Sequence, residues 1–276
     1  MVRIKAIRTS YWLPRSDYCE IILNSIKNFI TNGDVLVVSE KAISTAEKNF
    51  FDENNVIPGL SAKFLAMFWM RIIWGYFLGR ICHFRTEQIN HLRNYPFKEG
   101  SAHKQLVLNL SGLLQALKYG SEGGIDINNM PYSYACLPLT NSLECAKLIY
   151  NKIYSKTGKS ITILIADTDS TFSLRNIHIT SRPNPLRGIA SFGSVFFYIL
   201  GRALRLRQNA TPLALFGPNL SINEALKFSE LAHHARGYGV GRTIWETSEK
   251  LGIQFNGLTW DLLKQTNHFP LVLIRR

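Results

Sequence analysis

Residues 160–169 read Ser-Ile-Thr-Ile-Leu-Ile-Ala-Asp-Thr-Asp, and this stretch decides the fold around it. The run from Ser160 to Ala166 is short, apolar and rich in β-branched side chains, which is typical of a strand buried inside a sheet. Asp167, Thr168 and Asp169 follow it directly. We therefore expect these three polar residues at the C-terminal end of a strand, where ligand-binding side chains are commonly placed.

A second polar stretch, at residues 121–129, reads Ser-Glu-Gly-Gly-Ile-Asp-Ile-Asn-Asn. Its Gly-Gly pair allows the backbone to come close to a ligand. Asp126 and Asn129 offer hard oxygen ligands, which suit Mg²⁺, Mn²⁺ and phosphate-bound metal ions. The alternative is that the acidic residues of both stretches form ordinary Asx turns. Because the two stretches occur together, we favour a shared site for metal and phosphate.

The composition limits the number of domains and the kind of binding partner that we expect. The chain has 276 residues, of which 46% are hydrophobic, so it can form one large domain or two modest ones. Its net charge of +13 and pI near 9.7 indicate a surface that attracts polyanions, either nucleic acid or phosphorylated small molecules. Basic residues are spread along the chain in runs of at most two, so no basic arm is indicated.

The cysteines and the N-terminal residues indicate in which cellular compartment the protein is expected. The four cysteines show neither C-x-x-C spacing nor a Cys-His cluster, so we expect reduced core thiols without a disulfide framework or structural zinc. Charged residues within the first eight positions do not fit the apolar part of a signal peptide. We expect a cytoplasmic protein without a membrane partner.

Strands and helices are expected to alternate along the chain, which favours an α+β fold with mixed sheets. Asp17 is a candidate helix cap, and Ser221 with Glu224 has the spacing of a capping box. We expect polar connections at 85–102 and 180–185. The expected strands are 2–8, 34–39, 134–138, 160–166 and 269–274, and the expected helices are 17–31, 103–118, 141–155, 221–236 and 243–250.

One helix, at residues 64–84, is unusually apolar and aromatic. Arg71 interrupts it, and a charge near the middle of a lone membrane span costs at least about 2.5 kcal/mol. Lys63 and Arg80 shorten the uncharged run below the roughly 20 residues that a bilayer requires. We expect a buried or interface helix, and its aromatic surface favours burial against a second subunit in a homodimer.

A glycine-rich stretch, Gly-Tyr-Gly-Val-Gly-Arg at 237–242, follows a helix. A dinucleotide-binding fingerprint places its glycines after a strand, so a Gly-rich connection between helices is the alternative explanation. The amides of this stretch and Arg242 could still hold a phosphate, because a helix is expected to begin at residue 243.

Five stretches, in order along the chain, resemble motifs of the coenzyme F420-0:L-glutamate ligase (F420-0 gamma-glutamyl ligase) family. The first, GDVLVVSEKAISTAE at 33–47, resembles the family's G-D-[IV]-[LV]-V-V-x-Q-K-[IV]-V-S-K-A-E-G. The others are GIDINN at 124–129, IADT at 165–168, SELA at 229–232 and LKQTNHFPLVLIR at 263–275. Together they span both ends of the chain, which makes the resemblance fairly specific.

The resemblance implies a fold and an activity. It implies a ligase-like α+β module over residues 1–276, alternatively two non-contiguous lobes, in an intertwined dimer. The implied reaction joins L-glutamate through its amine to a carboxylate of an anionic deazaflavin-type substrate, coenzyme F420-0. GTP is the implied co-substrate and activates the acid as an acyl phosphate.

The resemblance also implies site residues. Asp126 and Asp167, the candidate catalytic residues, would hold one Mg²⁺ or Mn²⁺. Thr168 and Gln265 would hold a second ion, and K⁺ is a further candidate. The residues implied to contact the nucleotide are Glu40, Lys41, Asn129 and Gln265. Two metal ions that neutralise phosphate charge are the usual apparatus of phosphoryl transfer.

The chain departs from the family pattern at several positions. Thr45 stands where the family has Lys, Lys48 stands where it has Gly, and Asp169-Ser170 replaces Gly-Arg. Extra sequence lies around residues 65–100 and 237–262. The lost Lys removes a phosphate contact, while a new carboxylate could recruit or displace a metal ion.

Two alternatives to this function stay open. One is a related ligase with a different acid or amine. The other is a nucleotide-binding or nucleic-acid-binding protein that has lost the ligase chemistry, which the basic charge and His233-His-Ala-Arg236 allow.

Overall fold

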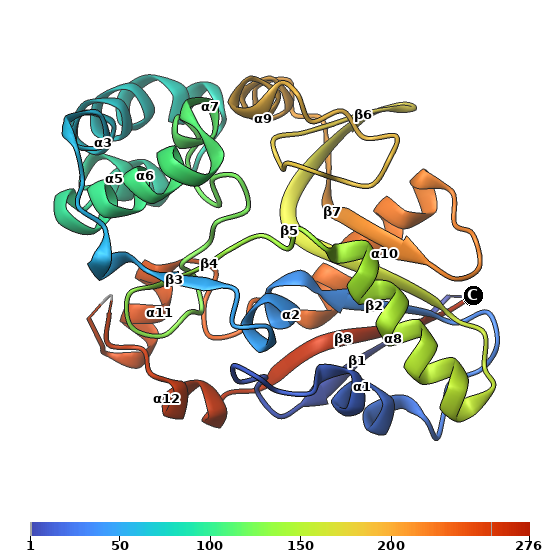
Figure 1. The fold of residues 1–276 in the computed structure, drawn as a ribbon. Helices are drawn as coiled ribbons and strands as arrows, with labels where there is room; N and C mark the ends of the chain where they lie inside the picture. The colour runs from blue at the N-terminus through green and yellow to red at the C-terminus, as the bar shows by residue number, and fades with distance from the viewer. Residues whose placement is uncertain (1, 255) are drawn as a thin grey trace.

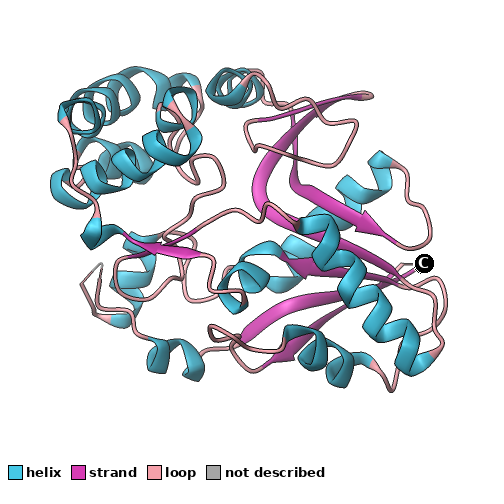
Figure 2. Ribbon diagram, viewed as in Figure 1, coloured by secondary structure: helices cyan, strands magenta, loops and turns pink. Residues whose placement is uncertain are grey.

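The computed structural model of the chain describes residues 2–254 and 256–276, and it consists of a mixed β-sheet with helices on both faces and a group of helices beside it (Figures 1 and 2). We call this group, at residues 60–116, the helical lobe. The strands are β1 (Arg3–Thr9), β2 (Val35–Ser39), β3 (Phe50–Asp52), β4 (Tyr134–Cys136), β5 (Thr162–Leu174), β6 (Ile177–Thr180), β7 (Arg207–Phe216) and β8 (His268–Arg275).

The helices fall into two sets. Those of the helical lobe are α3 (Leu60–Phe64), the π-helix η2 (Leu65–Leu78), α4 (Gly79–Ile81), α5 (Thr86–Arg93), α6 (Phe97–Ser111) and α7 (Leu113–Ala116). The others are α1 (Tyr18–Ile26), α2 (Glu40–Ala46), the 3₁₀-helix η1 (Glu53–Asn55), α8 (Ser142–Thr157), α9 (Ser194–Ala203), α10 (Ile222–Arg236), α11 (Ile244–Leu251) and α12 (Trp260–Gln265).

The main sheet has six strands in the order β1-β8-β2-β5-β6, and β7 also pairs with β5. The β2–β5 pair is parallel, whereas β1 with β8, β2 with β8, and β5 with β6 and β7 are antiparallel. The short strands β3 and β4 form a separate two-stranded sheet. The expected α+β fold with mixed sheets is therefore confirmed.

Both faces of the main sheet are covered, which explains the continuous apolar runs of its strands. Leu36 and Val38 of β2 pack with α1, α2 and α8 on one face. Val35 and Val37 pack with α10 on the other face. The two helix layers are visible in Figure 1 in front of and behind the strands.

Strand β5 is longer than the sequence predicts. It was expected to end at Ala166 but continues to Leu174. On one edge of β5, strand β2 pairs only with Thr162 to Ala166, and strand β6 pairs only from Thr171 onward. Between them, residues 167–170 face no strand on that edge, and the register with β7 shifts there, as at a β-bulge. The expectation that Asp167 ends a strand is thus wrong for β5, although it lies where the pairing with β2 ends.

Local helix signals were more informative than periodicity. Asp17 caps α1, and Ser221 and Glu224 form the expected capping box of α10. The expected polar connection at 85–102 is wrong, because it contains α5 and the start of α6. Helix α5 buries only Ile89 and Leu92, which is too few apolar residues to show a periodic pattern. Strands β6 and β7 were also missed.

The aromatic helix is continuous from Leu60 to Ile81 through α3, η2 and α4. Its length and composition would allow it to cross a membrane, but only 33% of its most apolar window is buried in the chain. Length and composition alone are not sufficient to show that a single helix of this kind spans a membrane. The expected helix is therefore only partly buried within its own chain, and its burial against a second subunit stays a prediction.

We expect Gly201→Ala to destabilise the protein. Gly201 of α9 lies against the fully buried ring of Phe172 in β5, and an added Cβ would be 2.2 Å from the ring. Helix propensity alone would stabilise an Ala here by up to about 1 kcal/mol. We expect instead a loss of about 1 to 3 kcal/mol in the free energy of urea unfolding, because the ring must shift.

The double variant Gly201→Ala/Phe172→Leu serves as the control. If the contact with the ring is the cause, the loss in the double variant is smaller than the sum of the two single losses. Additive losses would contradict this explanation.

Candidate active site

A cavity of about 740 Å³ opens at the edge of the sheet where β2 ends. This volume lies within the range of typical ligand sites. Its walls come from the start of α2, the bulge of β5, the stretch at 120–129, the end of α10 with the Gly-rich loop at 237–242, and the start of β8. Because β2 and β5 are parallel, the residues that follow β2 and the bulge of β5 meet at one edge of the sheet.

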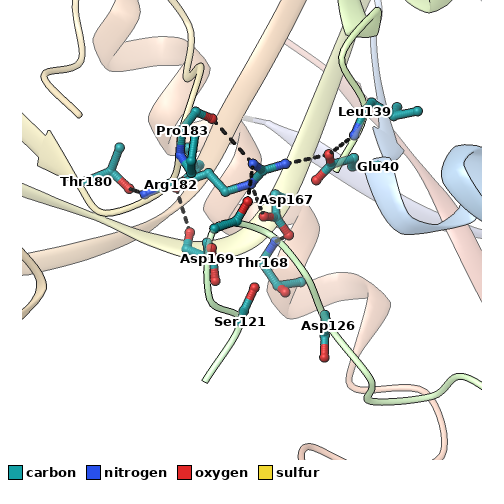
Figure 3. Close-up of polar contacts among 12 residues, drawn as sticks. Glu40, Ser121, Asp126, Leu139, Asp167, Thr168, Asp169, Thr180, Arg182 and Pro183 are labelled. Atoms are coloured by element: carbon teal, nitrogen blue, oxygen red, sulfur yellow. Dashed lines mark hydrogen bonds and ion pairs between the residues drawn. The ribbon is translucent and has the colours of Figure 1, made fainter. Parts of the chain in front are cut away.

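The buried guanidinium of Arg182 is at the centre of the charged groups behind this cavity (Figure 3). Its Nη2 donates to Oε1 of Glu40 at 2.5 Å, and its Nε donates to Oδ2 of Asp167 at 2.7 Å. Nη1 donates to the carbonyl of Gly123 at 3.3 Å. Arg182 therefore ties the start of α2 to the bulge of β5 and to the Gly-Gly pair.

The Gly-Gly pair makes room for this guanidinium. Gly124 has φ +86°, and a Cβ there would be 2.4 Å from Cζ of Arg182. Only glycine combines this conformation with the absence of a side chain. The sequence predicted that the backbone at this pair approaches a ligand, which stays a prediction; the group that lies against Gly124 in this structure is Arg182.

Burial and the neighbouring charges shift the pKa values of Glu40 and Arg182 in opposite directions. Burial raises the pKa of Glu40 to about 7, and Arg182 opposes that rise. Burial would lower the pKa of Arg182, but Glu40, Asp167 and Asp169 outweigh it and raise the pKa. Arg182 consequently stays protonated, and Glu40 is the carboxyl of the pair that can take up a proton near neutral pH.

Lys41 and Asp126 form the second ion pair of the site. The ammonium of Lys41 donates to Oδ2 of Asp126 and to the carbonyl of Asn128 at 2.9 Å. Oδ1 of Asp126 accepts from the amide of Asn128 at 2.8 Å, so the Asx-turn alternative is confirmed for this residue. Burial would lower the pKa of Lys41, but Asp126 outweighs it and raises the pKa. Lys41 is therefore a cation beside the cavity.

Asn129 and Asn128 hold the Gly-rich loop. Oδ1 of Asn129 accepts from the amide of Val240 at 3.0 Å, and its Nδ2 donates to the carbonyl of Gly241 at 3.2 Å. The Asn128 side chain donates to the same carbonyl at 3.0 Å. The stretch at 121–129 and the loop at 237–242, which are far apart in the sequence, thus form one wall.

The structure brings most, but not all, of the predicted residues to this cavity. Lys41, Asp126, Asn129, Asp167 and Thr168 line it. Glu40 lies behind the cavity wall, bonded to Arg182 and to the amide of Leu139.

Gln265 and Asp126 take positions that the sequence did not indicate. Gln265 is exposed at the end of α12 and does not line the cavity. In Figure 3, Asp126 lies apart from the group around Arg182 and points away from Asp167.

The carboxylates fit a divalent ion in chemistry but not in arrangement. Oxygen donors of Asp126, Asp167 and Thr168 are what Mg²⁺ or Mn²⁺ would select. Asp126, however, is paired with Lys41, and Asp167 with Arg182. Within the described ranges, no three His, Cys, Asp or Glu side chains are gathered as a metal site requires. A metal ion here would have to displace a cationic side chain, so the metal ligands stay a prediction.

Asp169 and Lys118 form a pair that the sequence did not reveal. The Lys118 ammonium lies 3.5 Å from Oδ2 of Asp169, and both side chains are buried. Burial raises the pKa of Asp169 to about 6, and Lys118 opposes that rise. Asp169 was noted as a departure from the family pattern, but nothing in the sequence pointed to Lys118 or to Arg182.

Arg236, the last residue of α10, has no ion-pair partner among the described residues. Both of its terminal nitrogens are buried, and neither makes a hydrogen bond within the part of the chain that the structure describes. Burial lowers its pKa to about 10, against the opposing charge of Asp167, so it is still protonated at neutral pH. Arg236 also lines the cavity. A buried cation without a partner is costly, and an anionic ligand would satisfy it.

A second buried network supports the opposite wall of the cavity. Nδ1 of His103 lies 2.6 Å from Oε1 of Glu53, and its Nε2 lies 2.5 Å from Oε2 of Glu122. Burial would lower the pKa of His103, but the two carboxylates outweigh it and raise the pKa to about 10. Lys104 donates to Glu122 at 2.7 Å and to the carbonyls of Ala116 and Lys118 at 2.8 Å. This network fastens the helical lobe to the cavity wall.

The fold and the site define an α+β protein with a cavity that both cationic and anionic side chains line, Lys41 and Arg236 among the cations and Asp126 and Asp167 among the anions. The chain belongs to the F420-0:Gamma-glutamyl ligase family, whose model matches residues 6–196. An uncharacterized protein of Methanocaldococcus jannaschii is 33% identical over 286 residues, which cover 99% of this chain and 96% of that protein. The family resemblance is confirmed, and it supports an enzyme with a gamma-glutamyl ligase role.

We expect Arg182→Gln to destabilise the protein in a pH-dependent way. Removing one partner of a buried ion pair costs about 3 to 5 kcal/mol, because the other charge stays buried. The folded-state pKa of Glu40 is already raised to about 7, so folding favours its protonated form as the pH falls. The loss in the free energy of urea unfolding should therefore be largest above pH 7 and smaller at pH 5.

Arg187→Gln is the matched control, because Arg187 lies in the same loop and is exposed. It should leave the stability unchanged at every pH. A loss for Arg182→Gln that is equal at pH 5 and pH 8 would contradict the role of Glu40.

Proposed function

We propose that the protein is a GTP-dependent gamma-glutamyl ligase that joins L-glutamate through its amine to a carboxylate of coenzyme F420-0, a deazaflavin-type acid. Membership of the F420-0:Gamma-glutamyl ligase family supports the type of reaction and the class of acid. Two cations that line the cavity, Lys41 and Arg236, support the use of a nucleoside triphosphate.

The observation that carries the proposal is the unpartnered guanidinium of Arg236 in the cavity wall. The triphosphate of GTP supplies the anionic oxygens that this group lacks. Lys41, at the N-terminus of α2, lies at the same cavity and adds a second cation. Phosphate oxygens held between two such groups would form charge-assisted hydrogen bonds, which are the stronger kind.

The aromatic side chains of the cavity suit planar rings. Tyr11, Tyr119, Tyr132, Tyr198 and Trp245 are among the residues that line it. Aromatic faces stack on flat heterocycles such as guanine or a deazaflavin. The same cavity thus offers cations for phosphates and aromatic faces for rings.

The proposed reaction has two steps. In the first, a carboxylate oxygen of the acid attacks the γ-phosphorus of GTP, the bond from that phosphorus to the β-γ bridging oxygen breaks, and GDP leaves with the electron pair. In the second, the glutamate amine attacks the acyl carbon, the carbon–oxygen bond to phosphate breaks, and inorganic phosphate leaves as the nitrogen loses a proton to solvent. Cations fixed near the transferring phosphoryl group stabilise the charge that develops on its oxygens.

The residues around the cavity have different proposed parts in this reaction. Lys41 and Arg236 bind phosphate oxygens directly. Asp126 orients Lys41, and Asn129 holds the Gly-rich loop that carries Arg242. Glu40 acts through Arg182 and does not touch the nucleotide. We retain Mg²⁺ or Mn²⁺ as proposed cofactors, whose ligands Asp126 and Asp167 would first have to leave Lys41 and Arg182.

The activity is tested by mass spectrometry of a reaction that contains GTP, L-glutamate, coenzyme F420-0 and Mg²⁺ or Mn²⁺. We expect one GDP and one phosphate for each glutamyl group added to the acid, and no product when any one component is omitted. ATP in place of GTP tests nucleotide choice. GTP hydrolysis without an amide product would favour a related ligase with another acid or amine, whereas GTP binding without turnover would favour a nucleotide-binding protein.

We expect Arg236→Gln to weaken GTP binding without lowering the stability of the free protein. Loss of a hydrogen bond to a charged group corresponds to roughly a 10- to 100-fold weaker affinity in calorimetric titration. Removing an unpartnered buried cation should leave the free energy of unfolding unchanged or higher.

Lys227→Gln is the matched control, because Lys227 is exposed on the same helix. It should change neither quantity. Unchanged GTP affinity in Arg236→Gln would remove the observation on which the nucleotide assignment rests.

A further inference from the structure

The helix at Leu60–Ile81 carries an exposed apolar stripe along its outer side. The stripe consists of Phe64, Phe68, Ile72, Phe77 and Ile81, each between 41% and 59% exposed. Most of the helix is a π-helix, whose i→i+5 hydrogen bonds give it between about four and five residues per turn, so side chains four or five positions apart stay on one side. The five side chains therefore form one continuous apolar surface, of the kind that marks an interaction site.

The opposite side of this helix is fixed within the helical lobe. Ala62, Ala66, Met70 and Trp74 are fully buried. The indole nitrogens of Trp69 and Trp74 both donate to the carbonyl of Leu117 at 2.8 Å. Crossing a bilayer would expose this buried side and break these bonds, so the helix can lie on an apolar surface but does not suit a span.

The charges on the helix itself have one sign. Exposed basic residues lie near both ends, Lys63 beside Phe64 and Arg80 beside Ile81. Residues 54–86 contain no Asp or Glu. Arg205, which follows α9, adds a third cation at the Ile81 end, because its Nη2 lies 3.3 Å from Nδ1 of His83.

This charge pattern decides between two occupants of the stripe. A two-fold contact between copies of the chain would place the stripe against itself, so that Lys63 and Arg80 would face a helix that carries cations and no carboxylate. An anionic lipid surface supplies phosphate groups to the basic residues and acyl chains to the aromatic ones. We propose that this stripe docks the protein onto the surface of an anionic membrane, with the helix in the plane of the headgroups.

Sedimentation with lipid vesicles tests the proposal. The wild-type protein should bind vesicles of phosphatidylcholine with about one third phosphatidylglycerol, about thirtyfold more strongly than vesicles of pure phosphatidylcholine, because two or more basic residues contact the headgroups. Added salt should weaken this binding. Phe68→Ser/Phe77→Ser should weaken binding at least about tenfold, because it removes two apolar side chains from the interface.

The control variant is Leu174→Ser/Ile177→Ser, which removes two exposed apolar side chains from the β5–β6 hairpin, away from the helical lobe (Figure 1). It should bind as the wild type does. Lys63→Gln/Arg80→Gln should reduce the preference for the anionic vesicles and keep the thermal stability.

Two results would overturn the proposal. The first is wild-type protein that sediments with neither kind of vesicle at low salt. The second is a wild-type dimer in light scattering that becomes a monomer in Phe68→Ser/Phe77→Ser, since a second copy would then cover the stripe.

Discussion

The structure of the site depends on one buried cation, the guanidinium of Arg182 between Glu40 and Asp167. It fixes the start of α2 against the bulge of β5, and Gly124 leaves the space that it fills. A buried ion pair of this kind contributes little net stability, because desolvation offsets the attraction, but breaking it leaves an unpaired charge. Its effect is therefore geometric: Lys41, the residue after Glu40, is held at the cavity beside Asp126.

The sequence predicted the parts of the fold that local patterns encode. The apolar runs of β2, β8 and the first half of β5 predicted central strands of the sheet. The capping residues Asp17 and Ser221 predicted where two helices begin. The second half of β5 was missed because polar residues interrupt the run at the bulge. Strand β7 was missed because its position is set by pairing with β5, which is distant in the sequence.

The site was predicted in outline for the same reason. The two polar stretches suggested a shared site for Asp126 and Asp167, and the family resemblance added Lys41, whereas the parallel pairing of β2 and β5 that brings Lys41 and Asp167 to one edge is seen only in the structure. Arg182 lies in an expected loop and Lys118 at the end of an expected helix, and only the folded chain brings them to Asp167 and Asp169. The departures from the family pattern also have local partners: Asp169 faces Lys118, and the Thr45 hydroxyl donates to the carbonyl of Lys41.

A continuous set of contacts joins the apolar stripe of the helical lobe to the cavity. Trp69 and Trp74 hold the carbonyl of Leu117, Lys104 holds the carbonyl of Lys118, and the Lys118 ammonium faces Asp169 in the bulge of β5. These groups are mostly buried, so solvent does not separate them, and buried packing shifts as a unit. The helix that carries the stripe and the cavity wall that carries Lys118 and Asp169 are therefore parts of one packed structure.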